Sequence, residues 1–157
     1  MRQIFIFLLV AIGTFIIDQN IKTWAVEAVN GVEYATIIKG SCIDLELHYN
    51  RGVAFSMLAF LGPYLKWLQA LLVVGILFFI LKENYLKRYA FPVGLLIGGA
   101  LGNVYDRFVH IGVVDYVAWH CGFNYAVFNY ADVAIDIAFV IIVWMYFKDS
   151  KTKKSLV

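Results

Sequence analysis

Residues 4–26 read IFIFLLVAIGTFIIDQNIKTWAV, an almost unbroken apolar run that decides how the rest of the chain is interpreted. About 20 such residues in a helix cross the hydrocarbon core of a bilayer. Arg2 precedes the run, so a cleavable signal peptide is the alternative, but no cleavage site of the A-x-A kind closes it. The run instead passes through Asp18 and Lys22 and continues to Val26. We therefore interpret residues 4–26 as a retained transmembrane helix.

Three further apolar runs are long enough to cross a membrane, and they cover residues 64–81, 89–108 and 128–147. The chain of 157 residues is 62% hydrophobic and only 15% charged, with a mean hydropathy of +0.78. A soluble domain usually has about 25% charged residues to cover its surface. The composition therefore predicts an all-α membrane protein with four transmembrane helices, built as one domain over residues 1–157. The net charge of +2 argues against a nucleic-acid partner.

The distribution of basic residues predicts the orientation in the membrane. They gather at the N-terminus, between the second and third spans, and in the tail: Arg2, Lys82, Lys87, Arg88, Lys148, Lys151, Lys153 and Lys154. The segments 27–62 and 109–127 contain only Lys39 and Arg51 as basic residues. We therefore expect both termini in the cytoplasm and these two segments outside it.

The first outer segment contains the period-two pattern of a half-buried strand, because Ile43, Leu45 and Leu47 alternate with polar residues. Residues 36–38 precede a Gly-Ser turn and provide a second apolar stretch. Together they predict a small extracytoplasmic β-sheet, whereas residues 109–127 are expected to form a loop.

Two cysteines, Cys42 and Cys121, fall in these outer segments. Their spacing matches neither a zinc or redox site nor a disulfide scaffold. A disulfide between them is one interpretation, and two unpaired or packed thiols are the one that we favour.

Polar residues within the spans are the most informative, because an ionisable side chain near the bilayer centre costs about 2.5–3.5 kcal/mol. They occur on three of the predicted helices: Asp18 and Lys22 on the first, Asn103, Asp106 and Arg107 on the third, and Asn129, Asp132 and Asp136 on the fourth. At about 1.5 Å per residue, the three helices bring polar residues to a similar depth, in the outer third of the membrane. Hydrogen bonding between helices is the simpler explanation, but this cluster costs more than helix association needs. We therefore predict a functional site, and for Asp136, one turn deeper, only a hydrogen bond to a neighbouring helix.

Spacing along the helices predicts two local contacts. Asp18 precedes Lys22 by four residues, the favourable arrangement for an ion pair within one helix. Gly94, Gly98 and Gly102 recur at every fourth residue, which predicts a groove where another helix approaches closely.

Asp115 and Asp132 are the candidate catalytic pair. Neither has an obvious basic neighbour in the sequence, unlike Asp18, which has Lys22 four residues later. Two carboxyl groups held close together cannot both ionise easily, so one of them keeps a proton. In aspartic proteases the ionised group takes a proton from water and the protonated group donates to the scissile carbonyl oxygen. The sequence does not indicate which aspartate keeps the proton.

Other chemistries are less well supported. The three histidines lack the spacing of a metal site, so no metal or other cofactor is expected. Ser56 and Lys22 could form a Ser-Lys peptidase, but nothing places them together. A small proton-coupled transporter is the main alternative function, because intramembrane carboxylates also relay protons. It would need a polar path through the cytoplasmic half, which is almost wholly apolar; a noncatalytic assembly subunit is a further alternative.

Five blocks of this sequence together resemble the lipoprotein signal peptidases, also called signal peptidase II. They appear in the family's order and span nearly the whole chain: residues 18–22 (DQNIK), 50–56 (NRGVAFS), 98–107 (GGALGNVYDR), 113–116 (VVDY) and 128–132 (FNYAD). The resemblance implies a four-helix enzyme of the bacterial inner membrane, without a cofactor, and we expect a monomer. Its partners would be membrane lipids and a prolipoprotein that already carries diacylglycerol on a cysteine. The enzyme would cut just before that cysteine and release the signal peptide.

The resemblance also implies roles for particular residues. Asp115 and Asp132 match the family's catalytic aspartates, and the supporting residues are Asp18, Lys22, Asn50, Gly52, Asn103, Asp106, Arg107, Asn129 and Ala131. Ala131 would leave room for the scissile peptide. Three differences from the family's usual pattern are Tyr116 in place of Phe, Ala126-Val127 where a Pro often stands, and Asp136 as an extra acid.

Overall fold

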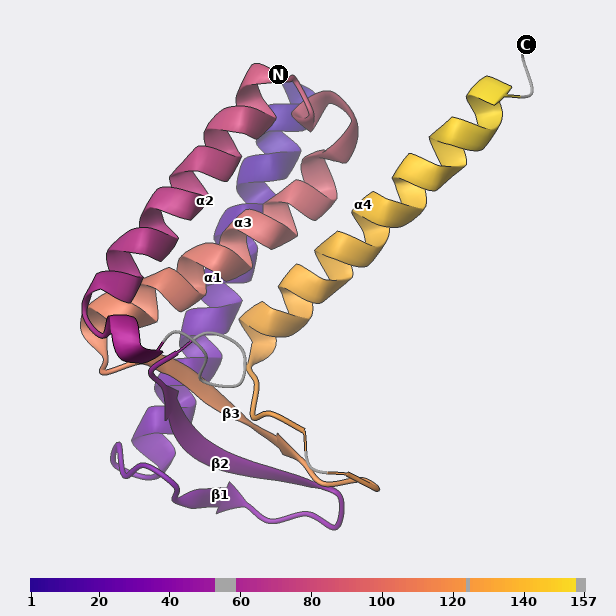
Figure 1. Cartoon of the computed structure of the whole chain (residues 1–157). Helices are drawn as coiled ribbons and strands as arrows, with labels where there is room; N and C mark the ends of the chain where they lie inside the picture. Colours follow the sequence, from indigo (N-terminus) through magenta and orange to yellow (C-terminus); the bar gives the residue numbers. More distant parts are fainter. Residues whose placement is uncertain (53–58, 124, 155–157) are drawn as a thin grey trace.

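The computed structural model describes residues 1–52, 59–123 and 125–154. Its helices are α1 (Arg2–Ala28), α2 (Tyr64–Lys82), α3 (Leu86–Val109) and α4 (Tyr130–Lys154), with a short 3-10 helix η2 (Ala59–Leu61). Its strands are β1 (Thr36–Ile38), β2 (Ile43–Asn50) and β3 (Val113–Trp119). Figure 1 shows α1, α2 and α3 side by side, with α4 leaning away from them toward its C-terminal end. The strands lie at one end of the helices, and both termini lie at the other.

The helices match the predicted spans to within three residues, except that α4 continues to Lys154, but the predicted count of four membrane spans is not confirmed. Among the described helices, three are long and apolar enough to cross a membrane: α1, α2 and the Tyr130–Lys148 part of α4. The remaining long helix, α3, has Pro92 and several glycines in its interior and carries Asp106 and Arg107 close to its C-terminal end at Val109. It packs against α1, α2 and α4, so much of its surface contacts protein. A fourth span through α3 stays a prediction.

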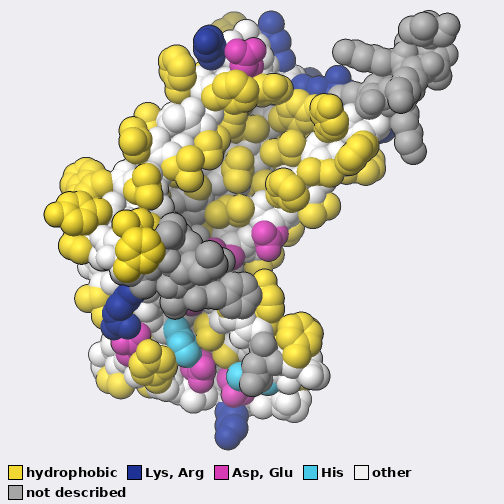
Figure 2. Space-filling model, viewed as in Figure 1, with side chains coloured by type: hydrophobic (Ala, Val, Ile, Leu, Met, Phe, Trp, Pro, Cys, Tyr) yellow, Lys and Arg dark blue, Asp and Glu magenta, His cyan; other side chains and the backbone are white. Residues whose placement is uncertain are grey.

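The outer surfaces of the other helices are strongly apolar. Figure 2 shows hydrophobic side chains covering the helical part, whereas charged side chains gather at its two ends. Leu8, Leu71 and Phe139 are examples of large apolar side chains that are exposed. Such a surface is stable in lipid rather than in water, as expected for a membrane protein.

Glycines on α3 permit the close contacts that their spacing predicts. A Cβ atom on Gly94 would lie 2.7 Å from the Cβ of Val10, and one on Gly98 would lie 2.8 Å from the Cβ of Thr14. Both contacts are with α1. Gly99 serves the other side of α3, where a Cβ atom would lie 2.7 Å from the carbonyl oxygen of Ala131 on α4.

The sheet contains both predicted strands and one that we did not predict. Its order is β1-β2-β3, and both neighbouring pairs are antiparallel. The expectation that residues 109–127 form a loop is wrong for residues 113–119, which form β3. In the register of this pair, His48 lies opposite Asp115. The sequence of β3 lacks a clear alternation because most of it is buried, so its strand character depends on pairing with β2.

The two cysteines form a disulfide, which corrects our preference for free thiols. Cys42 precedes β2 and Cys121 follows β3, with a Cα–Cα distance of 4.8 Å. The register explains the pairing, because Ile43 lies opposite Trp119 and brings the flanking segments together. This contact depends on the strand that was not predicted.

Candidate active site

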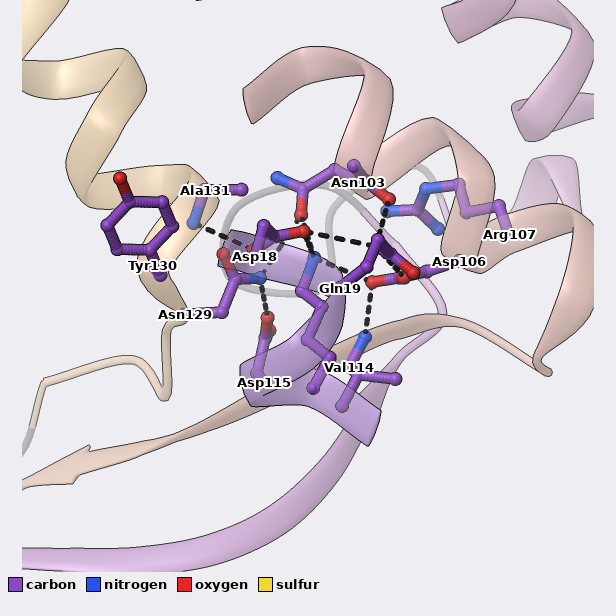
Figure 3. A network of polar contacts seen from close by, with 12 residues as sticks. Asp18, Gln19, Asn103, Asp106, Arg107, Val114, Asp115, Asn129, Tyr130 and Ala131 are labelled. Atoms are coloured by element: carbon purple, nitrogen blue, oxygen red, sulfur yellow. Dashed lines mark hydrogen bonds and ion pairs between the residues drawn. The ribbon is translucent and has the colours of Figure 1, made fainter. Parts of the chain in front are cut away.

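A cavity of about 510 Å³ is lined by residues from the helices and from the sheet. Asp115 from β3 and Asp132 from α4 both line this cavity. Asn50, Asn103 and Arg107 line it as well. The cavity therefore receives polar side chains from β2, α3, β3 and α4. Figure 3 shows Asn103, Arg107 and Asp115 among them.

Asp115 is held by two asparagine side chains. Asn129 Nδ2 donates to Asp115 Oδ1 at 2.7 Å, and Asn50 Nδ2 donates to Asp115 Oδ2 at 3.2 Å. The residue is only 3% exposed. Burial, followed by the negative charge of Asp132, raises the pKa of Asp115 to about 7, despite the hydrogen bonds that oppose this shift. Asp115 can therefore carry a proton near neutral pH.

Asp132 lies in the first turn of α4, where it forms a capping box with Asn129. The N–H of Asp132 donates to Asn129 Oδ1 at 3.0 Å, and the N–H of Asn129 donates to Asp132 Oδ2 at 3.2 Å. Asn103 Nδ2 donates to the other oxygen, Asp132 Oδ1, at 2.8 Å. Asn129 thus precedes α4, which begins at Tyr130, whereas we had placed it on the fourth predicted helix.

Two asparagines connect the aspartates to each other. Asn129 Nδ2 donates to Asn103 Oδ1 at 3.1 Å as well as to Asp115. Asn103 in turn donates to Asp132 and accepts from Lys22 Nζ at 2.9 Å. A continuous set of hydrogen bonds therefore runs from Asp115 to Asp132, with both side chains oriented toward the cavity.

Behind the cavity lies a buried group of charges. Lys22 Nζ lies 2.8 Å from Asp18 Oδ2 and 2.7 Å from Asp106 Oδ2, and all three side chains are almost fully buried. The first contact is the ion pair that the spacing predicted. Each acid also accepts from a backbone N–H: Asp18 Oδ1 from Ala131 at 3.1 Å, and Asp106 Oδ2 from Val114 at 3.1 Å. These bonds join α1 and α3 to the start of α4 and to β3, next to the two candidate catalytic residues.

Arg107 and Gly52 position Asn50. Arg107 Nη1 donates to the carbonyl oxygen of Asn50 at 3.2 Å, and Nη2 donates to the carbonyl oxygen of Gly52. The N–H of Gly52 donates to Asn50 Oδ1 at 3.0 Å, which leaves the amide nitrogen directed at Asp115. Residues 53–56 of the same sequence block, including Ser56, lie outside the described residues.

The structure brings nearly all of the predicted site residues into one network around the cavity. Ala131 differs from the expectation: it is fully buried, its backbone contacts Asp18 and Gly99, and it does not line the cavity. Asp136 differs too, because its side chain makes no hydrogen bond within the described residues.

Two contributing residues were missed. Gln19 Nε2 donates to Asp18 Oδ2 at 3.1 Å and to Asp106 Oδ1 at 3.0 Å. Its position next to Asp18 in the sequence could have indicated this role. The hydroxyl of Tyr116 accepts from the N–H of Tyr130 at 3.1 Å, and thereby satisfies a free donor at the start of α4. Tyr116, where the family usually has Phe, therefore makes a hydrogen bond that Phe could not make.

The strand β3 also guides the chain into α4. Phe128 forms a bridge with Val117, and its carbonyl oxygen accepts from the N–H of Val117 at 2.9 Å. This bridge turns the chain back so that Asn129 lies beside Asp115. In the part of the chain that the structure describes, His, Cys, Asp and Glu residues form no group of three that could hold a metal ion.

The fold and the site define a membrane protein with two carboxyl groups in one cavity, each held by asparagine side chains. A family model described as signal peptidase (SPase) II matches residues 10–148. A lipoprotein signal peptidase of Sulfurovum sp. is 69% identical over 94% of this chain and 97% of its own length. Those of Sulfurimonas denitrificans and Helicobacter pylori (strain P12) are 53% and 43% identical, each over 94% of this chain and 91% and 93% of their own lengths. The chain belongs to the signal peptidase II family of bacterial membrane peptidases.

Solved structures support the fold. A bacterial membrane enzyme determined at 2.3 Å resolution superposes with a TM-score of 0.78, covering 94% of this chain and 90% of that chain at 23% identity. A second, determined at 1.9 Å resolution, has a TM-score of 0.74, covering 91% of this chain and 93% of that chain at 24% identity. At these identities the likeness extends to the fold and not to the roles of individual residues.

Proposed function

We propose that this protein is an aspartic endopeptidase that removes the signal peptide from diacylglyceryl-modified prolipoproteins, cutting just before the lipidated cysteine. The observation that carries this proposal is the cavity that Asp115 and Asp132 share, with a continuous set of hydrogen bonds between them. The family supplies the reaction, since its curated members are lipoprotein signal peptidases. The enzyme acts as a monomer with one domain, residues 1–157.

The environment of each aspartate supports a division of labour. Asp115 has a pKa of about 7 and is almost fully buried, so it holds the shared proton. Asp132 accepts hydrogen bonds from Asn103 and from the N–H of Asn129 at the N-terminal end of α4, where the helix dipole favours negative charge. Asp132 is therefore the carboxylate that takes a proton from water.

The reaction then proceeds in two steps. The water oxygen attacks the scissile carbonyl carbon while Asp132 takes the water proton and Asp115 donates its proton to the carbonyl oxygen. In the resulting tetrahedral intermediate, Asp132 passes its proton to the amide nitrogen and Asp115 takes back a proton from a hydroxyl. The carbon–nitrogen bond breaks, and both carboxyls return to their starting states.

The position of the cavity suits a lipid-anchored substrate. It lies at the sheet end of the helices, beside the exposed apolar surface of α4. We propose that this end faces the outer leaflet and that both termini, which lie at the opposite end, are cytoplasmic. The acyl chains of the substrate would then enter the bilayer close to the carboxyl pair.

A gel-shift cleavage assay tests this function with purified enzyme and a diacylglyceryl-modified prolipoprotein. We expect wild type to release the signal peptide, and Asp115→Asn and Asp132→Asn to remain folded without activity, because Asn cannot exchange the proton. Glu83→Gln is the control, since Glu83 is exposed after α2, at the end of the helices far from the cavity. An inert wild type, or normal cleavage by either Asn variant, would refute the proposal.

A further inference from the structure

Two polar side chains in the same cavity take no part in the network described above. Asp136 on α4 and Gln69 on α2 both line the cavity. Asp136 is exposed to it and makes no side-chain hydrogen bond within the described residues. Gln69 Oε1 is buried, and among those same residues it has no hydrogen-bond donor. Within the described residues, the cavity therefore holds two acceptors without donors, one on α4 and one on α2.

Both acceptors belong to helices that are long and apolar enough to cross a membrane. Asp136 follows Asp132 by four residues, so it lies about 6 Å farther from the sheet along α4. Leaving a polar group without a partner in an apolar region costs several kcal/mol, so such groups usually have a function. Both side chains line a cavity large enough for a peptide segment. We therefore expect their hydrogen-bond donors to come from a peptide that binds in the cavity.

A peptide at the point of cleavage provides such donors. At its C-terminal end a helix leaves only carbonyl groups unpaired, but a segment unwound for cleavage leaves its N–H groups unpaired as well. In the proposed orientation, the substrate residues before the scissile bond point away from the sheet, toward Asp136. An extended chain rises about 3.3 Å per residue, so 6 Å corresponds to about two residues.

We propose that Asp136 and Gln69 form a subsite that binds backbone N–H groups of the signal peptide about two residues before the scissile bond. The subsite positions the unwound segment across the aspartate pair. It rests on the proposed peptidase function, and it adds to that function two residues outside the hydrogen-bond network that joins the aspartates.

Substrates with one amide replaced by an ester test the subsite, because an ester removes a single N–H. Lipidated synthetic substrates would carry the ester at the first, second or third position before the scissile bond. Wild type, Asp136→Leu, Asp136→Asn and Gln69→Leu are compared by kcat/KM on each substrate. Phe139→Leu is the matched control, since Phe139 is an exposed residue of α4 that does not line the cavity.

We expect one ester, near the second position, to lower wild-type kcat/KM about 10-fold, which corresponds to about 1.4 kcal/mol. Asp136→Leu and Gln69→Leu should lower kcat/KM for the all-amide substrate and become less sensitive to that ester. Asp136→Asn, which keeps an acceptor, should recover much of the loss, and Phe139→Leu should behave as wild type.

The inference is overturned if both Leu variants retain wild-type kcat/KM, or if they lose rate but stay fully sensitive to the ester. Cleavage by wild type in those experiments would leave the peptidase function intact. An inert wild type would instead refute the proposed function and this subsite together.

Discussion

The carboxyl group of Asp18 on α1 occupies the space that a side chain at position 102 of α3 would need. A Cβ atom built on Gly102 collides with Asp18 Oδ2. Asp18 in turn accepts from the N–H of Ala131, next to Asp132. The absence of a side chain at one position of α3 therefore supports the placement of a candidate catalytic residue on α4.

Gly102→Ala should destabilise the protein and lower its activity. The added methyl group must displace Asp18 or separate α1 from α3, and overpacking of this kind costs about 1–3 kcal/mol. Thermal unfolding in detergent and the cleavage assay measure both effects. Gly75→Ala on α2 is the control, because a Cβ atom there meets nothing within 4 Å. Equal stability of the two variants would show that the contact is unimportant.

Lys22→Met should be strongly destabilising, because it leaves Asp18 and Asp106 buried without their shared cation. Breaking a buried ion pair from one side costs about 3–5 kcal/mol. Adding Asp106→Asn should restore part of the loss, since it removes one of the unpaired charges. Denaturant unfolding of both variants tests this, and Lys82→Met at the exposed end of α2 provides the baseline. A double variant less stable than Lys22→Met would contradict the prediction.

Activity should depend on the proton held by Asp115. Because the pKa of Asp115 is about 7, we expect kcat/KM to fall as the pH rises through that value. A pH–rate profile of the purified enzyme on one lipidated substrate measures this. A profile that stays flat well above pH 7 would mean that Asp115 is not the proton donor.

The same shift predicts how stability depends on pH. Asp115 binds a proton in the folded state up to about pH 7, whereas its ordinary pKa is 3.8. Its contribution to stability is therefore complete below about pH 4 and is lost as the pH rises through about 7. Asp115→Asn cannot ionise, so its free energy of unfolding should exceed that of wild type near pH 8 and approach it near pH 5. Parallel stability curves for the two proteins would refute this.

The disulfide between Cys42 and Cys121 should stabilise the sheet end of the molecule. It joins residues separated by 79 positions, and native disulfides typically contribute about 2–4 kcal/mol. Replacing both cysteines by serine should lower the melting temperature, and reductant should lower that of wild type but not of the variant. If reductant leaves both melting temperatures unchanged, the disulfide does not form in the protein.

The sequence by itself determined the helices, the membrane setting and most of the site. Long apolar runs define helices locally, and polar residues within them, such as Asp18 and Asn103, are conspicuous because the membrane penalises them. The cap that Asn129 forms with Asp132 depends on residues three apart, but we did not predict it and placed Asn129 on the helix. The motifs around these residues indicated the protein family.

Only the tertiary structure decided how the two aspartates meet. Asp115 reaches the cavity because residues 113–119 pair with β2 and then with Phe128, and such pairing depends on partners distant in the sequence. The disulfide follows from the same register. Gln69 and Asp136 show the same limit: each looks isolated on its own helix, and only the packing of α2 and α4 around one cavity places them in a common site.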